Sequence, residues 1–362
     1  MWVKIEARPE PSTRMKYLSP LVAVALMLVT GLLFSAFMSL NPLATFHAFF
    51  IAPIDNRYGL GELGVKAIPL VLIGVGLSVG FRSNVWNIGA EGQLAMGAIF
   101  GGCVALYFYD QQGVYILPLM FVMGAIGGMF WAAIPALLRT RFNTSEILVS
   151  LMLNYVAILI LNYLVHEPLR DPQGFNFPES RMFSASATLP IVLQGTRLHI
   201  GVFVALAAVA LAWVFVRKSF LGYQMQVAGM ADAAALYAGF KRKRMIWVGL
   251  LTGGACAGVA GLMEVAGPIG QLVPSVSPGY GYAAIIVAFV GRLHPVGVLL
   301  AGLLMSLLYL GGESAQMHLG LPSAVTGVFQ GMLLFYLLAA DLFINFRIRW
   351  DAPGARAAET GS

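Results

Sequence analysis

Charge is what this sequence has least of. Only 10% of its 362 residues are charged, whereas 59% are hydrophobic, and its mean hydropathy is +0.81. Soluble proteins carry about 25% charged residues, so this composition excludes the soluble globular class. The apolar runs are continuous rather than alternating, which indicates membrane-spanning helices and argues against a barrel. The net charge of +6 does not indicate a nucleic-acid partner, because the distribution of the charged residues along the chain is typical of a membrane protein with basic cytoplasmic loops.

Cysteine and the usual sequence signatures of catalysis are also scarce. The two cysteines, Cys103 and Cys256, fall inside apolar runs and are interpreted as small packing residues rather than a disulfide or a metal site. The five histidines show no metal-ligand spacing. The chain has no Gly-x-x-x-x-Gly-Lys-Ser/Thr sequence, so we do not expect it to hydrolyse ATP. We therefore expect no catalytic residue, no cofactor and no metal.

Ten hydrophobic segments approach the length of a spanning helix, about 17–25 residues. They cover residues 18–40, 63–80, 86–108, 114–138, 146–165, 199–216, 246–266, 280–292, 296–314 and 323–345. The segment 280–292 is short and rich in glycine at its start, so we interpret it as a half-helix. The sequence thus predicts one transmembrane domain, residues 18–345, between terminal tails at 1–17 and 346–362.

The basic residues give these segments a direction. With the N-terminus inside, only five of the 22 basic residues fall in outer segments, namely Arg57, Lys66, Arg170, Arg181 and Arg197. The others lie inside, as the positive-inside rule requires, so both termini are predicted to be cytoplasmic. The outer loops are then 41–62 and 166–198, and the longest inner loop is 217–245. The loop 166–198 contains four prolines and is either a connector or a docking surface.

A polar stretch interrupts the third segment. It reads Asn84-Val85-Trp86-Asn87-Ile88-Gly89-Ala90-Glu91-Gly92-Gln93. An unsatisfied polar group in lipid costs several kcal/mol, so the stretch is either an interfacial loop or a broken helix start that lines a polar path. Glu91 fits path lining or an ion pair with Arg82. Pro278 to Tyr282 breaks the eighth segment at the matching place, which fits two inverted halves of five spans.

The long inner loop contains a run that favours a short helix. In residues 222–239, Asp232 is a candidate N-cap, an alanine-rich run follows, and Gly239 suits the C′ position. A helix of two turns is marginal alone in water, so the protein's own spans or a partner must hold it. The loop is therefore either a coupling helix for a cytoplasmic protein or a solvated loop with a basic membrane anchor.

Four stretches together resemble bacterial ABC importer permeases of the branched-chain amino acid, ribose and nucleoside group. They are residues 84–93, residues 222–239, Gly261-Leu262-Met263-Glu264-Val265-Ala266-Gly267, and Gly279-Tyr280-Gly281-Tyr282 through Gly291-Arg292-Leu293-His294-Pro295. The resemblance covers most of the chain from about residue 60 to residue 340, and the first stretch resembles the signature of the simple-sugar and nucleoside subset. One departure is that Asp232-Ala233-Ala234 and Gly239 only approximate the Glu-Ala-Ala…Gly loop of other ABC permeases.

The resemblance implies an all-α fold similar to ribose and vitamin B12 importer permeases, with about ten helices in two inverted halves and with broken or re-entrant helices. It implies import of nucleosides or related simple sugars across a bacterial inner membrane. It also implies a cytoplasmic ABC ATPase, a second permease subunit that is a different chain, and an extracytoplasmic substrate-binding lipoprotein. The alternative is a proton- or sodium-coupled secondary transporter with Glu91 and Glu264 as ion sites, which leaves the long inner loop unexplained.

Two sets of candidate functional residues follow from these observations. We expect the substrate path to be lined by Asn84, Trp86, Asn87, Glu91, Gln93, Glu264, Tyr280 and Tyr282. We expect coupling to the ATPase to involve Gly222, Ala228, Gly229, Asp232, Ala233, Ala234, Tyr237 and Gly239. Amide groups and aromatic faces in the first set would suit a neutral polar solute with a ring.

Overall fold

A computed structural model of the chain describes residues 2–8, 12–37, 39–322 and 324–351. Within these residues, ten helices fall on the ten predicted segments. They are α1 (Thr13–Phe37), α3 (Arg57–Phe81), α4 (Ala90–Tyr107), α5 (Ile116–Phe142), α6 (Glu146–His166), α7 (Gly201–Lys218), α10 (Arg242–Glu264), α11 (Tyr280–Val290), α12 (Pro295–Leu319) and α13 (Ala324–Asn345). In the described part of the chain, eight helices are long and apolar enough to cross a membrane, and α4 and α11 are not among them.

The loops contain shorter elements that the hydropathy pattern does not predict. The expected outer loop 41–62 contains α2 (Pro42–Phe46), η1 (His47–Ile51) and η2 (Ala52–Ile54), and α3 already begins inside it. The inner loop contains α8 (Phe220–Met230) and α9 (Asp232–Tyr237), and η3 (Val265–Ile269) continues α10 as a π-helical turn. In the expected tails, β1 (Trp2–Ala7) pairs antiparallel with β2 (Phe346–Asp351). Residues 1, 9–11 and 352–362 of those tails lie outside the described residues.

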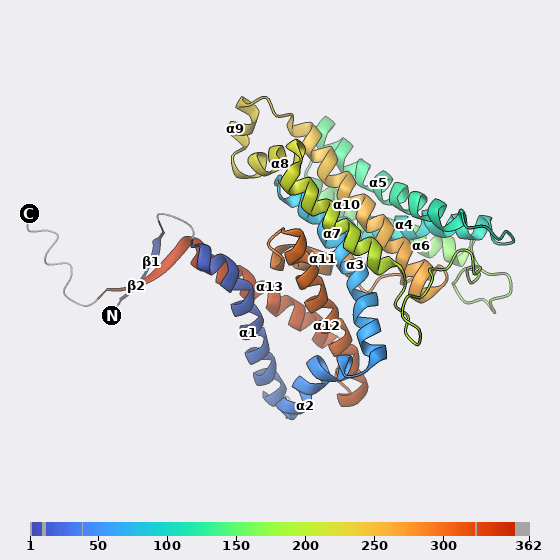
Figure 1. The fold of residues 1–362 in the computed structure, drawn as a ribbon, viewed down its shortest axis with the longest axis horizontal. Helices are drawn as coiled ribbons and strands as arrows, with labels where there is room; N and C mark the ends of the chain where they lie inside the picture. The colour runs from blue at the N-terminus through green and yellow to red at the C-terminus, as the bar shows by residue number, and fades with distance from the viewer. Residues whose placement is uncertain (1, 9–11, 38, 323, 352–362) are drawn as a thin grey trace, which may run out of the picture. The chain divides into compact units, whose positions relative to one another are not determined.

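The chain divides into two compact units, Met1–Phe49 with Gly312–Ser362, and Phe50–Gly311. In the first unit, α1 packs along α13, as Figure 1 shows. The Ser19 hydroxyl on α1 donates a hydrogen bond of 2.8 Å to the Asp341 carboxylate on α13. The rings of Phe49 and Phe329 lie 4.7 Å apart between centroids. A partly buried hydrogen bond and ring packing therefore contribute to holding the first unit together.

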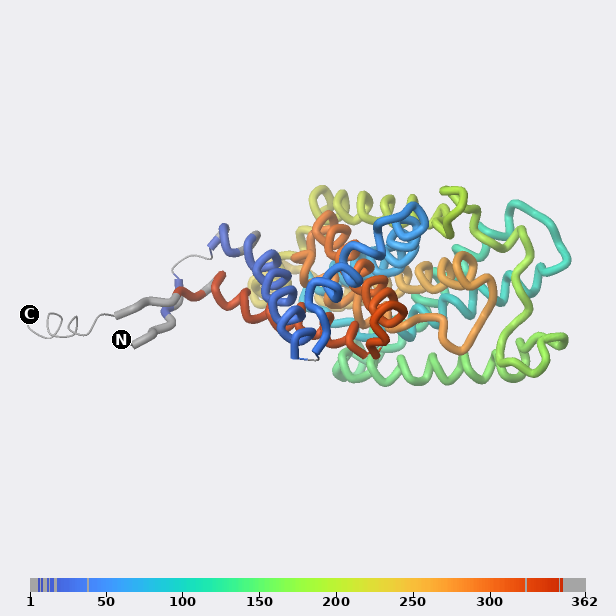
Figure 2. Tube along the Cα trace, turned by 90° about the horizontal axis from the view of Figure 1, so that it is seen from below, coloured from blue at the N-terminus to red at the C-terminus, as the bar shows by residue number. Residues whose placement is uncertain are grey.

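The second unit is built around α10, which packs extensively against α3, α4 and α5, and α4 also packs against α5. Figure 2 shows α6 and α7 along opposite edges of this group. A Cβ atom added to Gly258 on α10 would overlap the backbone of Gly124 and Gly128 on α5. Glycine is therefore required where these helices approach backbone to backbone, which is typical of membrane helix pairs.

Candidate functional site

The polar stretch predicted before α4 is a break in the helical path. Helix α3 ends at Phe81, and Asn84 adopts a left-handed conformation with φ of 56°. The Val85 N–H then bonds to the Gly80 carbonyl, and the Asn84 side chain accepts a bond of 2.9 Å from the Trp86 indole. Asparagine tolerates this conformation better than most residues, so Asn84 ends α3. The eight residues from Arg82 to Gly89 then connect α3 to α4 without a helix.

Two of the predicted path residues bond to each other inside this break. The Asn87 side-chain amide donates to the Gln93 carbonyl oxygen at 2.9 Å, and the Gln93 amide donates back at 3.0 Å. The Asn87 oxygen also accepts from the Gly89 backbone N–H at 3.0 Å. Both side chains are buried, so these bonds satisfy polar groups that would otherwise be costly. In this arrangement the pair holds the break together, and contact with a solute stays a prediction.

Asn154 on α6 is a central residue of the break that the sequence analysis missed. Its side-chain oxygen accepts from the Gly92 N–H at 2.9 Å, and its amide donates to the Ile88 carbonyl at 2.9 Å and to the Tyr282 hydroxyl at 3.1 Å. The residue is fully buried. It therefore joins α6 to the break and to α11. An asparagine in the middle of an apolar helix was the signal in the sequence, because such a residue needs a partner.

The start of α11 lies against the start of α4. The Glu91 carboxylate, in the first turn of α4, accepts a hydrogen bond of 2.6 Å from the backbone N–H of Gly281. Ser277 and the Gly279 N–H also bond to this carboxylate. A Cβ atom on Gly281 would overlap the backbone of Glu91. The two predicted breaks are thus brought together, and Glu91 supplies a hydrogen-bond acceptor at the N-terminus of α11, where backbone N–H groups lack helical partners.

The predicted ion pair between Glu91 and Arg82 is not formed. Instead, the Arg82 guanidinium donates two hydrogen bonds, of 3.0 and 2.7 Å, to the Leu293 carbonyl just after α11. The ends of α3 and α11 therefore lie at one level. Helix α11 has 11 residues, or about 16 Å, which is roughly half of a hydrocarbon core about 30 Å thick. The Glu91–Gly281 contact thus lies about half a membrane away from that level, as the half-helix interpretation predicts.

The aromatic members of the predicted path fall into two groups. Trp86 stacks on Phe289, with ring centroids 5.6 Å apart, and also contacts Phe81. Tyr280 is buried and packs edge-on against Tyr309. Tyr282, in contrast, keeps 37% of its surface exposed. Of these predicted residues, Tyr282 presents the most accessible side chain beside the Glu91–Gly281 contact.

Glu264 lies in a different place from Glu91. Its electrostatic neighbours are Lys66, Arg197 and Glu62, near the start of α3. The Arg197 guanidinium donates two hydrogen bonds to the Glu62 carboxylate, of 2.9 and 2.5 Å, and this pairing raises the pKa of Arg197 above its usual value. Nearby His199 is buried, and burial lowers its pKa to about 4. The structure therefore places Glu264 in a charged cluster that is separate from the two breaks.

Basic groups face one another at the level where α3 and α11 end. Burial and the charge of Arg217 lower the pKa of Arg82. Burial lowers the pKa of His294 most, and the charges of Arg217 and then Arg82 lower it further. Each shift disfavours the protonated form, first because the group is partly buried and second because other positive charges lie close by. This end of the second unit is thus positively charged.

The predicted coupling loop folds into two helices rather than one. Ser219 caps α8 by accepting from the Gly222 N–H at 2.9 Å. At the end of α9, Gly239 has a φ of 77°, and the Phe240 N–H bonds to the Ala235 carbonyl. Gly239 at C′ is therefore confirmed. Asp232 as the N-cap is wrong by one position, because Ala231 holds that place and Asp232 forms an ion pair of 2.6 Å with Arg242.

One face of α8 and α9 is buried against the helices of the same chain. Ala228 and Met225 on α8 and Ala235 on α9 pack with Val79 of α3 and Met245 of α10 in a hydrophobic cluster. The opposite face is exposed and apolar, with Tyr237 at 97% and Met230 at 81% exposure. We call this the apolar coupling face; it consists of Phe220, Tyr223, Met230, Leu236 and Tyr237. Ala233 and Ala234 lie exposed beside it.

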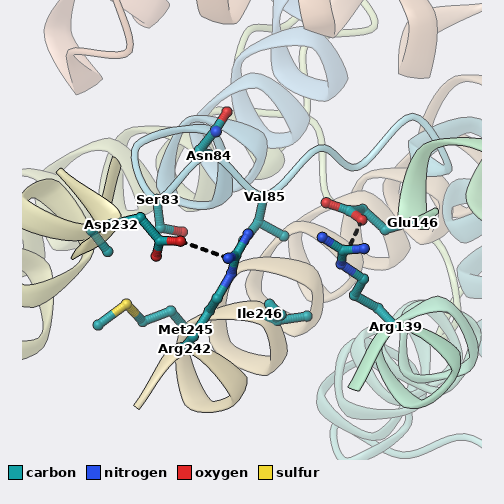
Figure 3. Close-up of a pocket in the computed structure, with 10 residues that line it drawn as sticks. Ser83, Asn84, Val85, Arg139, Glu146, Asp232, Arg242, Met245 and Ile246 are labelled. Atoms are coloured by element: carbon teal, nitrogen blue, oxygen red, sulfur yellow. Dashed lines mark hydrogen bonds and ion pairs between the residues drawn. The ribbon is translucent and has the colours of Figure 1, made fainter. Parts of the chain in front are cut away.

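Gly229 connects this loop to the break. A Cβ atom on Gly229 would overlap the Arg82 carbonyl oxygen and approach Ser83, so α8 rests directly on the residues that leave α3. Beside this contact lies a cavity of about 50 Å³. Figure 3 shows its two ion pairs, Asp232–Arg242 and Glu146–Arg139, on either side of Val85 and Ile246. That volume suits a few water molecules and is too small for a nucleoside.

Comparison with known proteins identifies relatives along most of the chain. The family model described as "Branched-chain amino acid transport system / permease component" matches residues 59–338. The glucose ABC transporter permease protein TsgB13 of Haloferax volcanii is 34% identical over 96% of this chain and 93% of its own length. The guanosine ABC transporter permease protein NupP of Bacillus subtilis is 32% identical, over 91% and 94%. The nucleoside ABC transporter permease protein NupB of Lactococcus lactis subsp. cremoris is 27% identical, over 94% of each.

Proposed function

The chain belongs to the permease-component family of branched-chain amino acid transport systems, as a membrane permease subunit of an ABC importer, and we propose that it carries nucleosides or related simple sugars. The observation that carries this proposal is that its named relatives transport glucose, guanosine and nucleosides. The accessible groups beside the breaks support the same class. Asn84, Trp86 and Tyr282 offer an amide and aromatic faces that suit an uncharged ring with hydroxyl groups.

We also infer that the substrate path runs past the contact between α4 and α11. Half-helix termini near the membrane midplane are where many transporters bind their substrates. Here the Glu91 carboxylate already occupies the N-terminus of α11. An anionic substrate would therefore meet an acidic group at this point, whereas a neutral solute would not. The arrangement supports a neutral substrate, and Glu264 would act at a separate charged cluster.

The proposed orientation places both termini and the loop with α8 and α9 in the cytoplasm of a bacterial cell, with the chain in its inner membrane. The cluster of Arg82, Arg217 and His294 at that end supports this orientation, because cytoplasmic ends of membrane helices carry an excess of basic residues. The strand β1 before α1 pairs with the strand β2 after α13, so these two segments lie side by side.

The partners in this proposal are a cytoplasmic ABC ATPase, a second and different permease subunit, and an extracytoplasmic binding lipoprotein. The ATPase would bind the apolar coupling face. Large exposed apolar side chains outside the lipid are typical of protein interfaces, and Tyr237 is almost fully exposed. Movement of that face would reach the break through the contact of Gly229 with Arg82. ATP binding drives transport only if the ATPase prefers one of two permease conformations.

Uptake measurements test this function directly. Labelled guanosine and labelled glucose are offered to cells that express the chain with its partner subunits, and to cells that lack either this chain or the ATPase. We expect uptake of at least one probe to require both. Uptake that persists without the ATPase would instead support the ion-driven secondary transporter, for which none of the three relatives above provides support.

A further inference from the structure

The orientation of the Asn154 side-chain amide is determined by the backbone around it. Its oxygen faces the Gly92 N–H, which only donates, and its nitrogen faces the Ile88 carbonyl, which only accepts. Exchanging the amide oxygen and nitrogen would turn both contacts into repulsions. The second N–H of the same amide therefore points at the Tyr282 hydroxyl, 3.1 Å away.

This geometry determines what the Tyr282 hydroxyl can do. Its oxygen accepts from Asn154, so its own hydrogen is directed elsewhere. Among the described residues, none accepts a hydrogen bond from this hydroxyl. The side chain is 37% exposed, whereas Asn154 behind it is fully buried. Tyr282 thus presents a directed donor at the contact between α4 and α11.

We propose that the Tyr282 hydroxyl donates a hydrogen bond to an acceptor atom of the transported solute, and that Asn154 is the positioning residue that gives it this polarity. The solute class is a neutral molecule with an exposed acceptor, such as a ring nitrogen or carbonyl of a nucleobase or an oxygen of a sugar. The inference rests on the proposed function and deepens it, because it names the Tyr282 hydroxyl as the protein group that distinguishes solutes with an acceptor atom from solutes without one.

The first variant removes only the donor. Tyr282→Phe keeps the ring and loses the hydroxyl, and Asn154 retains its two backbone partners. The measurement is direct binding of labelled guanosine and labelled glucose to the purified complex of permease and ATPase subunits. We expect Tyr282→Phe to bind the probe that the wild type binds about three- to tenfold more weakly, the usual worth of one hydrogen bond. Tyr163→Phe, the same change at an exposed tyrosine of α6, is the matched control and leaves binding unchanged.

The second variant reverses the polarity of the contact. In Asn154→Asp, the oxygen that replaces the amide nitrogen carries at most one hydrogen, which the Ile88 carbonyl takes. The Tyr282 hydroxyl must then donate to Asp and is no longer available to the solute. We expect the same loss of affinity as for Tyr282→Phe, and no further loss when the two changes are combined. A merely structural role of Asn154 predicts instead that the losses add.

Solute analogues identify the acceptor. Guanosine is compared with 2′-deoxyguanosine and 7-deazaguanosine, or glucose with its singly deoxygenated forms, each lacking one acceptor. We expect one analogue to bind the wild type more weakly and to lose nothing more in Tyr282→Phe. Equal binding of the probe by wild type and Tyr282→Phe, or an equal loss in Tyr163→Phe, would overturn this inference alone. A wild-type complex that binds neither probe would overturn the proposed function and this inference with it.

Discussion

The break before α4 buries polar side chains, whereas the loop of α8 and α9 exposes apolar ones. In the break, Asn87, Gln93 and Asn154 lie inside the protein, and their side chains bond to one another or to the backbone. In the loop, Met230 and Tyr237 lie outside with little cover. Satisfied polar groups in a buried site favour one rigid arrangement, whereas uncovered apolar groups favour binding to another surface. We therefore expect the first region to be rigid, and we propose that the second binds a partner.

The strongest disruption of this division is expected where the two regions touch. Gly229→Trp inserts a ring where even a Cβ atom would overlap the Arg82 carbonyl, so α8 must leave its place on α3. We expect ATP-dependent uptake to fall to background while the protein still inserts into the membrane, as measured by immunoblot of the membrane fraction. Gly327→Trp in α13 is the control, because no atom of the described residues outside its own helix backbone lies within 4 Å of a Cβ at that position. Normal uptake by Gly229→Trp would separate the loop from transport.

The rigidity of the break is tested by Asn154→Leu. This change leaves the Gly92 N–H and the Ile88 carbonyl without their partners, at a cost of about 1–3 kcal/mol for each buried group. We expect a loss of stability of about 2–5 kcal/mol, measured as a lower denaturation temperature of the purified complex. Asn162→Leu on the same helix is the control, because the Asn162 side-chain amide donates to the Ile158 carbonyl of its own helix. Equal effects of both changes would contradict a special role of Asn154.

The reciprocal pair of Asn87 and Gln93 makes a smaller and more specific prediction. Gln93→Leu leaves the Asn87 amide unpaired and should cost about 2 kcal/mol. Replacing both residues by leucine removes the unpaired groups together, so the double variant should lose less than the two single variants combined. The measurement is a double-mutant cycle on thermal or denaturant unfolding of the complex. Strict additivity would mean that the pair does not stabilise the break.

The recognition role of the loop is tested on its exposed face. Leu236→Ser and Tyr237→Ser together remove apolar surface without touching the buried cluster. We expect affinity for the ATPase subunit to fall about tenfold, or roughly 1.4 kcal/mol, with little change in the unfolding of the permease itself. Binding is measured with purified subunits in detergent. Phe175→Ser, at a similarly exposed residue in the loop 166–198, is the control and should leave ATPase binding unchanged.

The smallest effect is expected from the ion pair at the edge of the loop. Asp232 and Arg242 are both about half exposed, although they lie only 2.6 Å apart. Surface pairs of this kind contribute about 0–1 kcal/mol and are screened by salt. Asp232→Asn should therefore change stability by less than about 1 kcal/mol, and the difference should vanish at high salt. A larger, salt-independent loss would show that Asp232 belongs to the rigid region.

Hydropathy predicted the helices well because a spanning helix is a local feature of composition. Ten predicted segments match ten described helices, and the short segment ending near Gly291 is indeed a half-helix. The structure of the two tails was not predicted. Pairing of β1 with β2 joins residues from opposite ends of the chain, and no local pattern predicts such a partner.

The site was predicted less completely, for the same physical reason. The stretch from Asn84 to Gln93 stood out because it is polar where lipid is expected. Its partners did not stand out, because Asn154 lies 62 residues from Gly92 and Gly281 lies 190 residues from Glu91. Which polar groups meet depends on how the helices pack, so Arg82 was chosen for Glu91 on sequence proximity alone. The residue types therefore showed which positions need a polar partner, but the sequence did not show which residue that partner is.

The contact between Glu91 and Gly281 also constrains how the protein is made. A helix of 11 residues reaches about 16 Å and cannot cross a bilayer by itself. The Ser277 hydroxyl accepts from the Tyr280 N–H, whereas the Gly281 N–H depends on the Glu91 carboxylate and would be left without that partner in lipid. Helix α11 therefore cannot settle during synthesis as an independent span. Its place in the membrane depends on α4, whose Glu91 lies 190 residues earlier in the chain.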